Sequence, residues 1–372
     1  MTFVTLIVIL LTFILLRYYF KFYVKLSNLP HKKGSFILGN LEKFTGKLFE
    51  KSTRPLYATV FEAINRMSQS YREEGIFVIW LTWIPFVMIT NAKIVEAILS
   101  SNEILEKANA YQMFFPWLRT GLLTSGGKKW KTRRKMLTPT FHFQILNDFI
   151  PIMNHHANVL IEKLRKTNGE SVNIVNYIPL ATLDTISETA MGVSIDAQQC
   201  PNSQYINSVF DASEKIQNRF FSILHKLDFI YFRSQSGKQF MKSVEFMRNF
   251  TLNVINKKKE QMLREKKDDK KSNDDESSDV IFFGSRKKKM AFIELLLKHH
   301  LDTLKADGSS ELEIEDIREE VDTFMFEGFD TTSTSILFTL FLLADVILKP
   351  RAPINMRFIS RHNQRYDEST RF

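Results

Sequence analysis

The chain has 372 residues, a length that allows two or three small domains or one large one. Hydrophobic residues make up 44% and charged residues 25%, which is ordinary globular composition and excludes a disordered, collagenous or fibrous protein. A single Cys excludes a disulfide framework and a zinc site built from several thiolates, and it fits a reducing compartment. The net charge of +10 is spread along the chain, so we expect no nucleic-acid partner; an anionic membrane surface or an acidic protein explains it as well.

The N-terminus has the features of a membrane anchor. Residues 2–16 carry no charge and consist mainly of Leu, Ile, Val and Phe. With the aromatic residues that follow, the apolar stretch reaches roughly 19 residues, close to the ~20 that span a bilayer. A cleaved signal peptide, the alternative, would have basic residues before this stretch and small residues after it. Instead Arg17, Lys21 and Lys25 follow, which predicts a single-pass transmembrane helix over residues 1–20 with the bulk of the chain in the cytosol.

The rest of the sequence predicts a mainly α-helical fold with a small β-sheet near the N-terminus. Residues 21–45 are basic and contain proline, which indicates a hinge. Two β-rich runs, 76–81 and 86–89, lie on either side of a proline and predict a hairpin. From Ala92 onward the hydrophobic spacing is helical, and 33 Phe against 13 Gly and 10 Pro favour an aromatic-rich helical core. Residues 257–289 alternate basic and acidic blocks, which predicts a solvated loop inside the domain.

The clearest helix is predicted over residues 311–343, where apolar residues recur at helical spacing. Ser310 and Glu313 have the spacing of a capping box at its start. Two prolines then break the pattern, and the polar residues beyond them show no apolar face. We therefore expect residues 344–372 to form a tail that does not pack on the helix.

The middle of this helix contains residues that are unfavourable in a plain helix. The run 326–332 reads FEGFDTT, and Gly328 costs about 1 kcal/mol relative to Ala in a helix interior. The hydroxyl of Thr331 can bond back to a carbonyl, and Glu327 lies among aromatic residues where burial would penalise its charge. One interpretation is helix–helix packing through small residues. The other is a widened groove in which Asp330 and Thr331 form an acid–hydroxyl pair that relays protons to a bound small molecule.

A second candidate site lies in the basic run that begins at Trp130. Trp130 and Arg134 are four residues apart, so they share a face if the segment is helical. An indole N–H and a guanidinium on one face suit a carboxylate or a phosphate. The alternative interpretation is a basic, solvated surface helix.

Taken together and in this order, these motifs resemble the cytochrome P450 superfamily of haem-thiolate monooxygenases, in particular its family-4, fatty-acid ω-hydroxylase branch. The most specific runs are WKTRRKMLTPTFHF at 130–143 and EVDTFMFEGFDTT at 320–332. They are accompanied by the Leu29-Pro30 hinge and by Pro116-Trp117-Leu118. The resemblance covers roughly residues 1–343.

The resemblance implies a role for each candidate residue. Trp130 and Arg134 would bind the haem propionates. Gly328, Asp330 and Thr331 would form the oxygen groove and the proton relay.

Two further positions of the helix follow from the same resemblance. Glu327 occupies the position where this branch can esterify a haem methyl group, and Phe329 stands where a His is common. The expected cofactor is haem, with NADPH-derived electrons supplied by a reductase. The expected partners are the lipid bilayer, O2 and a lipophilic substrate, and the expected location is the endoplasmic reticulum membrane. The basic residues around Trp130 are candidates for the reductase contact, although a plain solvated face explains them as well.

One family feature is missing. The family takes its iron ligand from a Cys in the pattern Phe-x-x-Gly-x-x-x-Cys-x-Gly, whereas Cys200 has Val193, Asp196 and Asn202 at the corresponding positions. We therefore expect no axial metal ligand in this sequence and a partial catalytic domain over residues 46–343, without the C-terminal third of the family fold. The expected function is a membrane-bound haem monooxygenase of fatty acids or xenobiotics, with this chain an inactive fragment. The alternative is a non-catalytic, membrane-anchored helical protein that binds lipids or a partner.

Overall fold

The computed structural model describes residues 56–81, 84–222, 224–274, 292–344 and 355–357, together with scattered positions between residues 9 and 40. Most of the expected anchor and most of the expected tail lie outside these residues. Within the described part of the chain, no helix is both long enough and apolar enough to cross a membrane. The chain divides into two compact units, Met1–Leu105 and Glu106–Phe372.

The first unit contains an antiparallel hairpin. Its elements are α3 (Leu56–Ser70), β1 (Ile76–Leu81), β2 (Ile84–Ile89) and α4 (Ala92–Leu99). The hairpin confirms the predicted one, and its second strand begins two residues earlier than expected. Pro85 lies opposite Trp80 in a sheet of two described strands, where a residue without an N–H is tolerated. The fully buried Asn40, from the segment 21–45, contacts this hairpin. Its side-chain oxygen accepts a hydrogen bond from the Trp80 backbone N–H at 2.8 Å.

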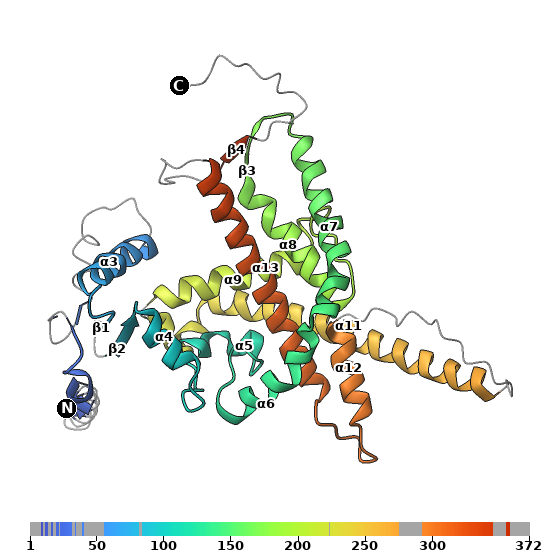
Figure 1. Ribbon diagram of the computed structural model, residues 1–372, viewed down its shortest axis with the longest axis horizontal. Coiled ribbons are helices and arrows are strands. Elements are labelled where there is room, and N and C mark those ends of the chain that lie inside the picture. The colour runs from blue at the N-terminus through green and yellow to red at the C-terminus, as the bar shows by residue number, and fades with distance from the viewer. Residues whose placement is uncertain are drawn as a thin grey trace. The chain divides into compact units, whose positions relative to one another are not determined.

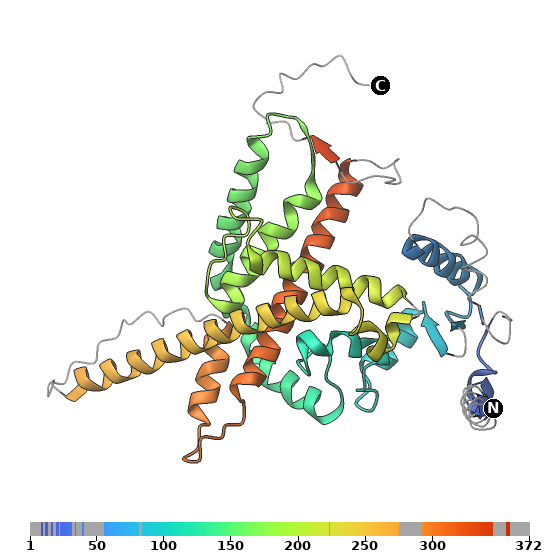
Figure 2. The ribbon, with the colours of Figure 1, turned by 180° about the vertical axis from the view of Figure 1, so that it is seen from behind.

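The second unit is almost entirely helical. Its helices are η1 (Asn109–Phe114), α5 (Phe115–Leu118), α6 (Gly127–Leu137), η2 (Thr138–Phe141), α7 (Phe143–Arg165), η3 (Ile174–Asn176), α8 (Ile178–Ile186), the π-helical turn η4 (Ser187–Met191), α9 (Gln204–Phe221), η5 (Leu224–Lys226), α10 (Asp228–Tyr231), α11 (Gln235–Asp274), α12 (Phe292–Asp302) and α13 (Ile314–Ala344). Helix α13 passes through the middle of this unit and packs along α8 (Figure 1). Helices α9 and α11 cross α13 on the side that faces the viewer in Figure 2. The expected mainly helical fold with a small antiparallel sheet is confirmed.

The buried face of α13 follows the predicted spacing. Four apolar residues recur every four positions and are at most 3% exposed: Ile317, Val321, Met325 and Phe329. The Ser310 backbone N–H donates to Glu313 Oε1 at 2.9 Å, but this bond lies before the helix, and the capping contact is instead made by the Glu313 N–H, which donates to Asp316 Oδ2 at 3.1 Å. The helix itself begins at Ile314, three residues later than predicted.

Helices α13 and α8 approach each other closely at Gly328. A Cβ atom placed there would lie 2.5 Å from Ile186 Cγ1, closer than real carbon atoms approach. One turn away, the Thr182 hydroxyl of α8 donates to the Phe329 carbonyl at 3.1 Å. The structure therefore gives Gly328 the helix-packing role that was one of its two sequence interpretations.

A buried arginine ties α13 to two other helices. Arg318 is 1% exposed, and its Nη1 lies 2.6 Å from Asp322 Oδ2 and 3.4 Å from the Trp117 carbonyl of α5. Asp322 accepts a second hydrogen bond from the Thr251 hydroxyl of α11 at 2.7 Å. Burial nevertheless raises the pKa of Asp322 to about 6, even with the Arg318 guanidinium beside it. Removing one partner of a buried pair leaves the other charge unpaired, at about 3–5 kcal/mol, so this network fixes where α13 lies.

The charged segment 257–289 differs from expectation in its first half. Helix α11 continues to Asp274, so residues 257–274 are helical rather than a loop. Lys, Glu, Gln, Met and Arg are all good helix formers, and the segment also spaces opposite charges four apart, as at Glu260 and Arg264. Lys258 further anchors it to α12 through Glu294 at 2.9 Å. Alternating charge therefore marked a solvated helix here, not an absence of structure.

Part of the expected tail also pairs with the second unit. Strand β4 (Asn355–Arg357) forms an antiparallel pair with β3 (Ser171–Asn173). Backbone hydrogen bonds of this kind do not require an apolar face, so the polar composition of the tail gave no sign of them. The remaining residues of 345–372 lie outside the described part of the chain.

Gly328→Ala should destabilise the protein. A helical Gly→Ala change normally stabilises by up to about 1 kcal/mol, but the added methyl group here collides with Ile186 and should lower the free energy of unfolding by about 1–3 kcal/mol. Denaturant unfolding monitored by circular dichroism measures the change. In the double variant with Ile186→Ala, the loss should be smaller than the sum of the two single losses. A stabilised Gly328→Ala variant would contradict the packing role.

Candidate functional site

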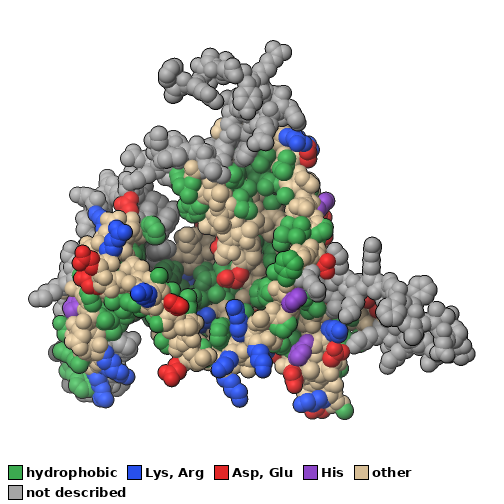
Figure 3. Space-filling model, viewed as in Figure 1, with side chains coloured by type: hydrophobic (Ala, Val, Ile, Leu, Met, Phe, Trp, Pro, Cys, Tyr) green, Lys and Arg blue, Asp and Glu red, His purple; other side chains and the backbone are tan. Residues whose placement is uncertain are grey.

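One side of α13 is open. With about 3.6 residues per turn, Glu327, Thr331, Phe338 and Leu342 lie on one face, opposite the buried Phe329. Phe338 is 59% exposed and Leu342 is 63% exposed, although both are large and apolar. Figure 3 shows apolar side chains exposed over the upper part of the second unit. The candidate acid and hydroxyl groups therefore lie on a helix face that is largely uncovered in this structure.

The acid–hydroxyl pair has a defined local geometry. The Thr331 hydroxyl donates to the Glu327 carbonyl at 2.7 Å, the back-bonding expected from the sequence. The Ser333 hydroxyl donates in the same way to the Asp330 carbonyl at 3.0 Å. The two hydroxyls thus use backbone carbonyls of their own helix.

Both carboxyl groups hold their protons more tightly than usual. The pKa of Glu327 is raised by burial and by the nearby charge of Asp330, against an opposing effect of Lys107. The pKa of Asp330 is raised by loss of solvent around its carboxylate. Groups whose pKa lies closer to neutral pH are better proton donors and acceptors, so this pair suits proton transfer.

Lys107 brings the two candidate sites together. Its Nζ lies 5.7 Å from the centre of the Trp130 ring and 5.7 Å from that of Tyr111, within cation–π range. The same charge opposes the raised pKa of Glu327. Lys107 is therefore within cation–π range of Trp130, and its charge acts on Glu327 of α13. Sequence reasoning missed Lys107, because its only signal was a lysine four residues before Tyr111, a common pattern.

Arg134 and its basic neighbours divide into two groups. Arg134 lies on α6 one turn after Trp130, is exposed, and has no side-chain partner among the described residues. In contrast, Arg133 is 8% exposed and its Nη2 lies 2.6 Å from Asp316 Oδ1, while Lys129 Nζ lies 3.0 Å from Glu319 Oε2. Arg133 is buried and cannot contribute to an external surface, whereas Lys129 stays partly exposed although it pairs with α13.

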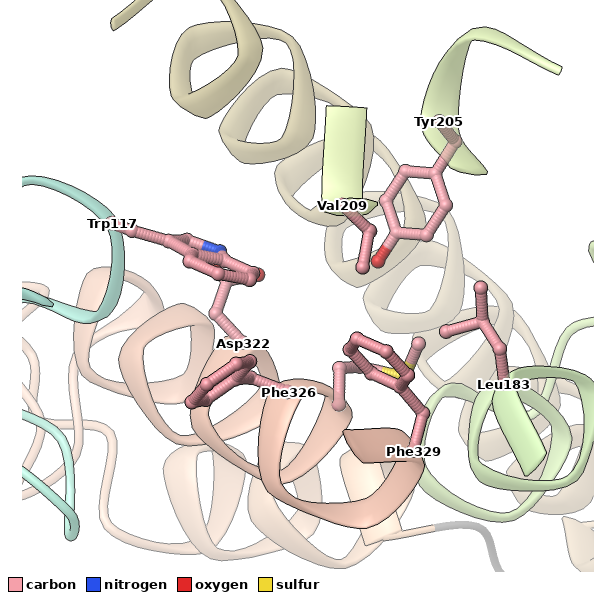
Figure 4. Close-up of a pocket in the computed structure, with 8 residues that line it drawn as sticks. Trp117, Leu183, Tyr205, Val209, Asp322, Phe326 and Phe329 are labelled. Carbon is pink, nitrogen blue, oxygen red and sulfur yellow. The ribbon is translucent and has the colours of Figure 1, made fainter. Parts of the chain in front are cut away.

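Phe329 lies on the other side of α13. It is 2% exposed and stands edge-on to the Phe210 ring at 5.9 Å between centres. Figure 4 shows it beside a small cavity into which the Tyr205 hydroxyl points. The cavity measures about 10 Å³, room for about one water molecule, and Asp322 is its charged lining residue. The unusual residue at 329 therefore affects internal packing rather than the open face.

These donors fit a planar group with two carboxylates. The exposed Arg134 guanidinium, the Trp130 indole N–H and the Lys107 ammonium group are donors for carboxylates, and the open face of α13 supplies exposed apolar side chains. Haem has this combination of two propionates and an apolar ring. Arg134, Trp130 and Lys107 could bind the propionates, whereas Gly328 is turned towards α8 and contributes no side of the open face.

Known proteins share this sequence over most of its length. The family model described as Cytochrome P450 matches residues 43–346. Cytochrome P450 4V2 of Homo sapiens is 42% identical over 284 residues, which are 76% of this chain and 52% of that protein. Cytochrome P450 4d1 of Drosophila melanogaster is 35% identical over 337 residues, 89% of this chain and 62% of that protein. The chain thus spans about half the length of the first of these relatives.

Solved structures agree on the fold. The crystal structure of the cytochrome P450DA heme domain superposes with a TM-score of 0.59 at 17% identity, covering 85% of this chain and 60% of that one. At this identity the likeness concerns the fold alone. A mainly helical second unit around α13, a small antiparallel sheet and a family match over residues 43–346 all agree, and the chain belongs to the cytochrome P450 family, of the family-4 type.

Proposed function

We propose that the protein acts as a haem-dependent monooxygenase on a lipophilic substrate, a fatty acid or a xenobiotic. The observation that carries the proposal is the cluster around Lys107. Lys107 Nζ lies 5.7 Å from the centre of the Trp130 ring, and its charge acts on Glu327, one turn from the Asp330–Thr331 pair on the open face of α13. The relatives' family membership supports the same chemistry. The partners we propose are a reductase supplied by NADPH, O2 and the lipid bilayer.

Each residue has a distinct role in this proposal. Haem, when bound, supplies the reduction and activation of O2. Trp130 Nε1, the Arg134 guanidinium and Lys107 Nζ bind and orient the propionates. The Asp330 carboxyl group holds a proton and passes it towards the face on which the Thr331 hydroxyl lies. Phe338 and Leu342 exclude water from that face once it is covered.

The exposure and the sequence surroundings of the single cysteine favour a second candidate function. Cys200 is exposed, and the residues around it lack the Phe and Gly positions of the family's iron-ligand loop. Residues 1–372 would then bind haem without thiolate ligation and be inactive as a monooxygenase. The exposed apolar residues Phe338 and Leu342 would instead suit a non-catalytic, membrane-anchored lipid-binding or interaction protein.

Haem binding is the direct test. Titration of the purified chain with hemin, followed by absorbance, should give a saturable complex, and Trp130→Ala and Arg134→Ala should each weaken it about 10- to 100-fold because each removes a hydrogen bond to a charged group. Lys135→Ala, on the same helix but on a different face, serves as the matched control and should bind like the wild type. Equal affinity in all four proteins would refute the propionate assignment. In the reduced carbon-monoxide complex we expect no Soret band typical of thiolate ligation, and such a band, lost on Cys200→Ala, would show the chain to be competent.

The relay role of Thr331 needs a protein that contains the cysteine loop. In a chimaera that joins residues 1–343 to the corresponding C-terminal segment of a cytochrome P450 relative, Thr331→Ala should uncouple NADPH consumption from product formation. The physical reason is that the hydroxyl which positions the proton next to Asp330 is lost. The ratio of product formed to NADPH consumed is the measurement, with exposed Thr334→Ala as the control one turn further along α13. An unchanged ratio would count against the relay.

We further propose a domain arrangement with residues 1–20 as a membrane anchor, 21–45 as a hinge, 46–343 as the catalytic domain and 344–372 as a tail. The uncharged run followed by Arg17, Lys21 and Lys25 supports an orientation with the bulk in the cytosol, at the endoplasmic reticulum.

Carbonate extraction of expressing cells should leave the chain in the membrane pellet, because a spanning helix resists high pH. Deletion of residues 2–20 should release it, at least in part. Protease added to intact microsomes should digest the bulk of the chain. Full protection from protease, or release of the intact chain by carbonate, would exclude this topology.

A further inference from the structure

The segment between α5 and α6 crosses the first turns of α13 at close range. A Cβ atom on Gly121 would lie 2.7 Å from the Glu319 carbonyl oxygen of α13, so only glycine fits at this crossing. Next to it, the Leu122 backbone N–H donates to Glu320 Oε2 at 3.0 Å, and the Thr120 hydroxyl donates to Glu319 Oε2 at 3.1 Å. Three consecutive residues of the segment therefore contact α13 directly.

The same turns of α13 also hold α6. Arg133 lies 2.6 Å from Asp316, and Lys129 lies 3.0 Å from Glu319. Trp130 follows Lys129 directly, and its own backbone N–H donates to Gly126 at 3.2 Å, where the segment ends. The position of the Trp130 ring thus depends on how the segment and α6 lie against α13.

Glu320 is the least solvated member of this contact. It is 0% exposed, whereas its neighbour Glu319 has a cation as a partner. Its Oε2 accepts only the Leu122 N–H, and its Oε1 has no hydrogen-bond partner among the described residues. Nη1 of Arg133 is likewise buried without a partner in this part of the structure. A carboxyl group is therefore buried here with a single backbone hydrogen bond, although burial of an unpaired charge is unfavourable.

We propose that Glu320 is a positioning residue that holds the segment 119–126 against α13 and thereby fixes where α6 presents Trp130. The proposal rests on the haem-binding role proposed above for Trp130. Glu320 itself does not reach the open face, since it lies two turns before Glu327 and is fully buried. Its effect on any bound group is therefore transmitted through the segment and α6.

The protonation state of Glu320 modulates this contact. Burial raises its pKa to about 7; the Leu122 N–H and the charges of Arg133 and Lys129 on α6 oppose the rise, and Glu319 on α13 adds to it. When segment 119–126 lies against α13, the buried Glu320 carboxyl group binds its proton more tightly than a solvated carboxyl group does. The contact between the segment and α13 is therefore most stable below the ordinary pKa of 4.5. This contact weakens as the pH rises from 4.5 to about 7, and its stability is constant above that pH.

Two substitutions separate the acceptor from the charge. Glu320→Met removes the acceptor but keeps an unbranched side chain of similar length, and Glu320→Gln keeps an acceptor oxygen without a charge. Hydrogen exchange of the full chain, corrected for intrinsic rates, reports the Leu122 and Trp130 amides. At about pH 4, where the wild-type carboxyl group is protonated, Glu320→Met should lower the protection of both amides about tenfold, while Glu320→Gln should match the wild type. At about pH 8, Glu320→Gln should be better protected than the wild type. Glu245→Met, an exposed acid on α11, is the control for the substitution.

The outcomes decide between the possibilities. Equal exchange in the Met and Gln variants, or a faster Leu122 amide with an unchanged Trp130 amide, would overturn the proposal. If Glu320→Met loosens the whole fold, seen as lost protection throughout α8, the pH comparison of the wild type with Glu320→Gln decides alone, and parallel pH profiles overturn the proposal. Hemin titration then tests the proposed function separately. Weaker binding by Glu320→Met, as by Trp130→Ala, supports both roles. An effect on exchange with no effect of either variant on hemin supports the positioning and overturns the haem assignment.

Discussion

The position of α13 depends on the pairing of charges that its first turns bury. Arg318 and Asp322 neutralise each other inside the second unit, and Thr251 and the Trp117 carbonyl add hydrogen bonds to the pair. A charge left without its partner at such a site would be strongly unfavourable, so the helix cannot slide or rotate without breaking the set. Everything that the open face presents depends on this rotation. A helix turned by one residue, about 100°, would move Thr331 off that face and bring Asp330 or Thr332 into its place.

The two faces of α13 differ in what they contact. The buried face packs on α8, α9 and α11, with Gly328 allowing the closest approach to α8. The open face carries Glu327 and Thr331, and the charge of Lys107 acts on Glu327. The FEGFDTT run therefore combines a glycine at a close helix contact on one side with acid and hydroxyl side chains on the other.

Some of this could be predicted from the sequence and some could not. Periodicity predicted α13 to within three residues at its start, and spacing placed Trp130 and Arg134 on one helix, because both signals are local. The partners of Lys107, Gly328 and Glu320 come from segments tens to hundreds of residues away, and no local pattern encodes such contacts. For the charged segment after residue 257, the sequence predicted a loop where the structure has a helix. Its composition indicates solvation correctly, but solvation does not distinguish a loop from an exposed helix, and α11 continues through half of it.

The buried location of Phe329 has a consequence for how such a protein can diverge. Its ring borders an internal void of about 10 Å³ shared with Trp117 and Tyr205, and it does not touch the groups on the opposite face. A replacement at this position alters the interior shape between α9 and α13 while the neighbouring acid and hydroxyl keep their surroundings. A single helix can therefore accumulate changes along one edge independently of the other, and variation at position 329 need not signal any change in chemistry.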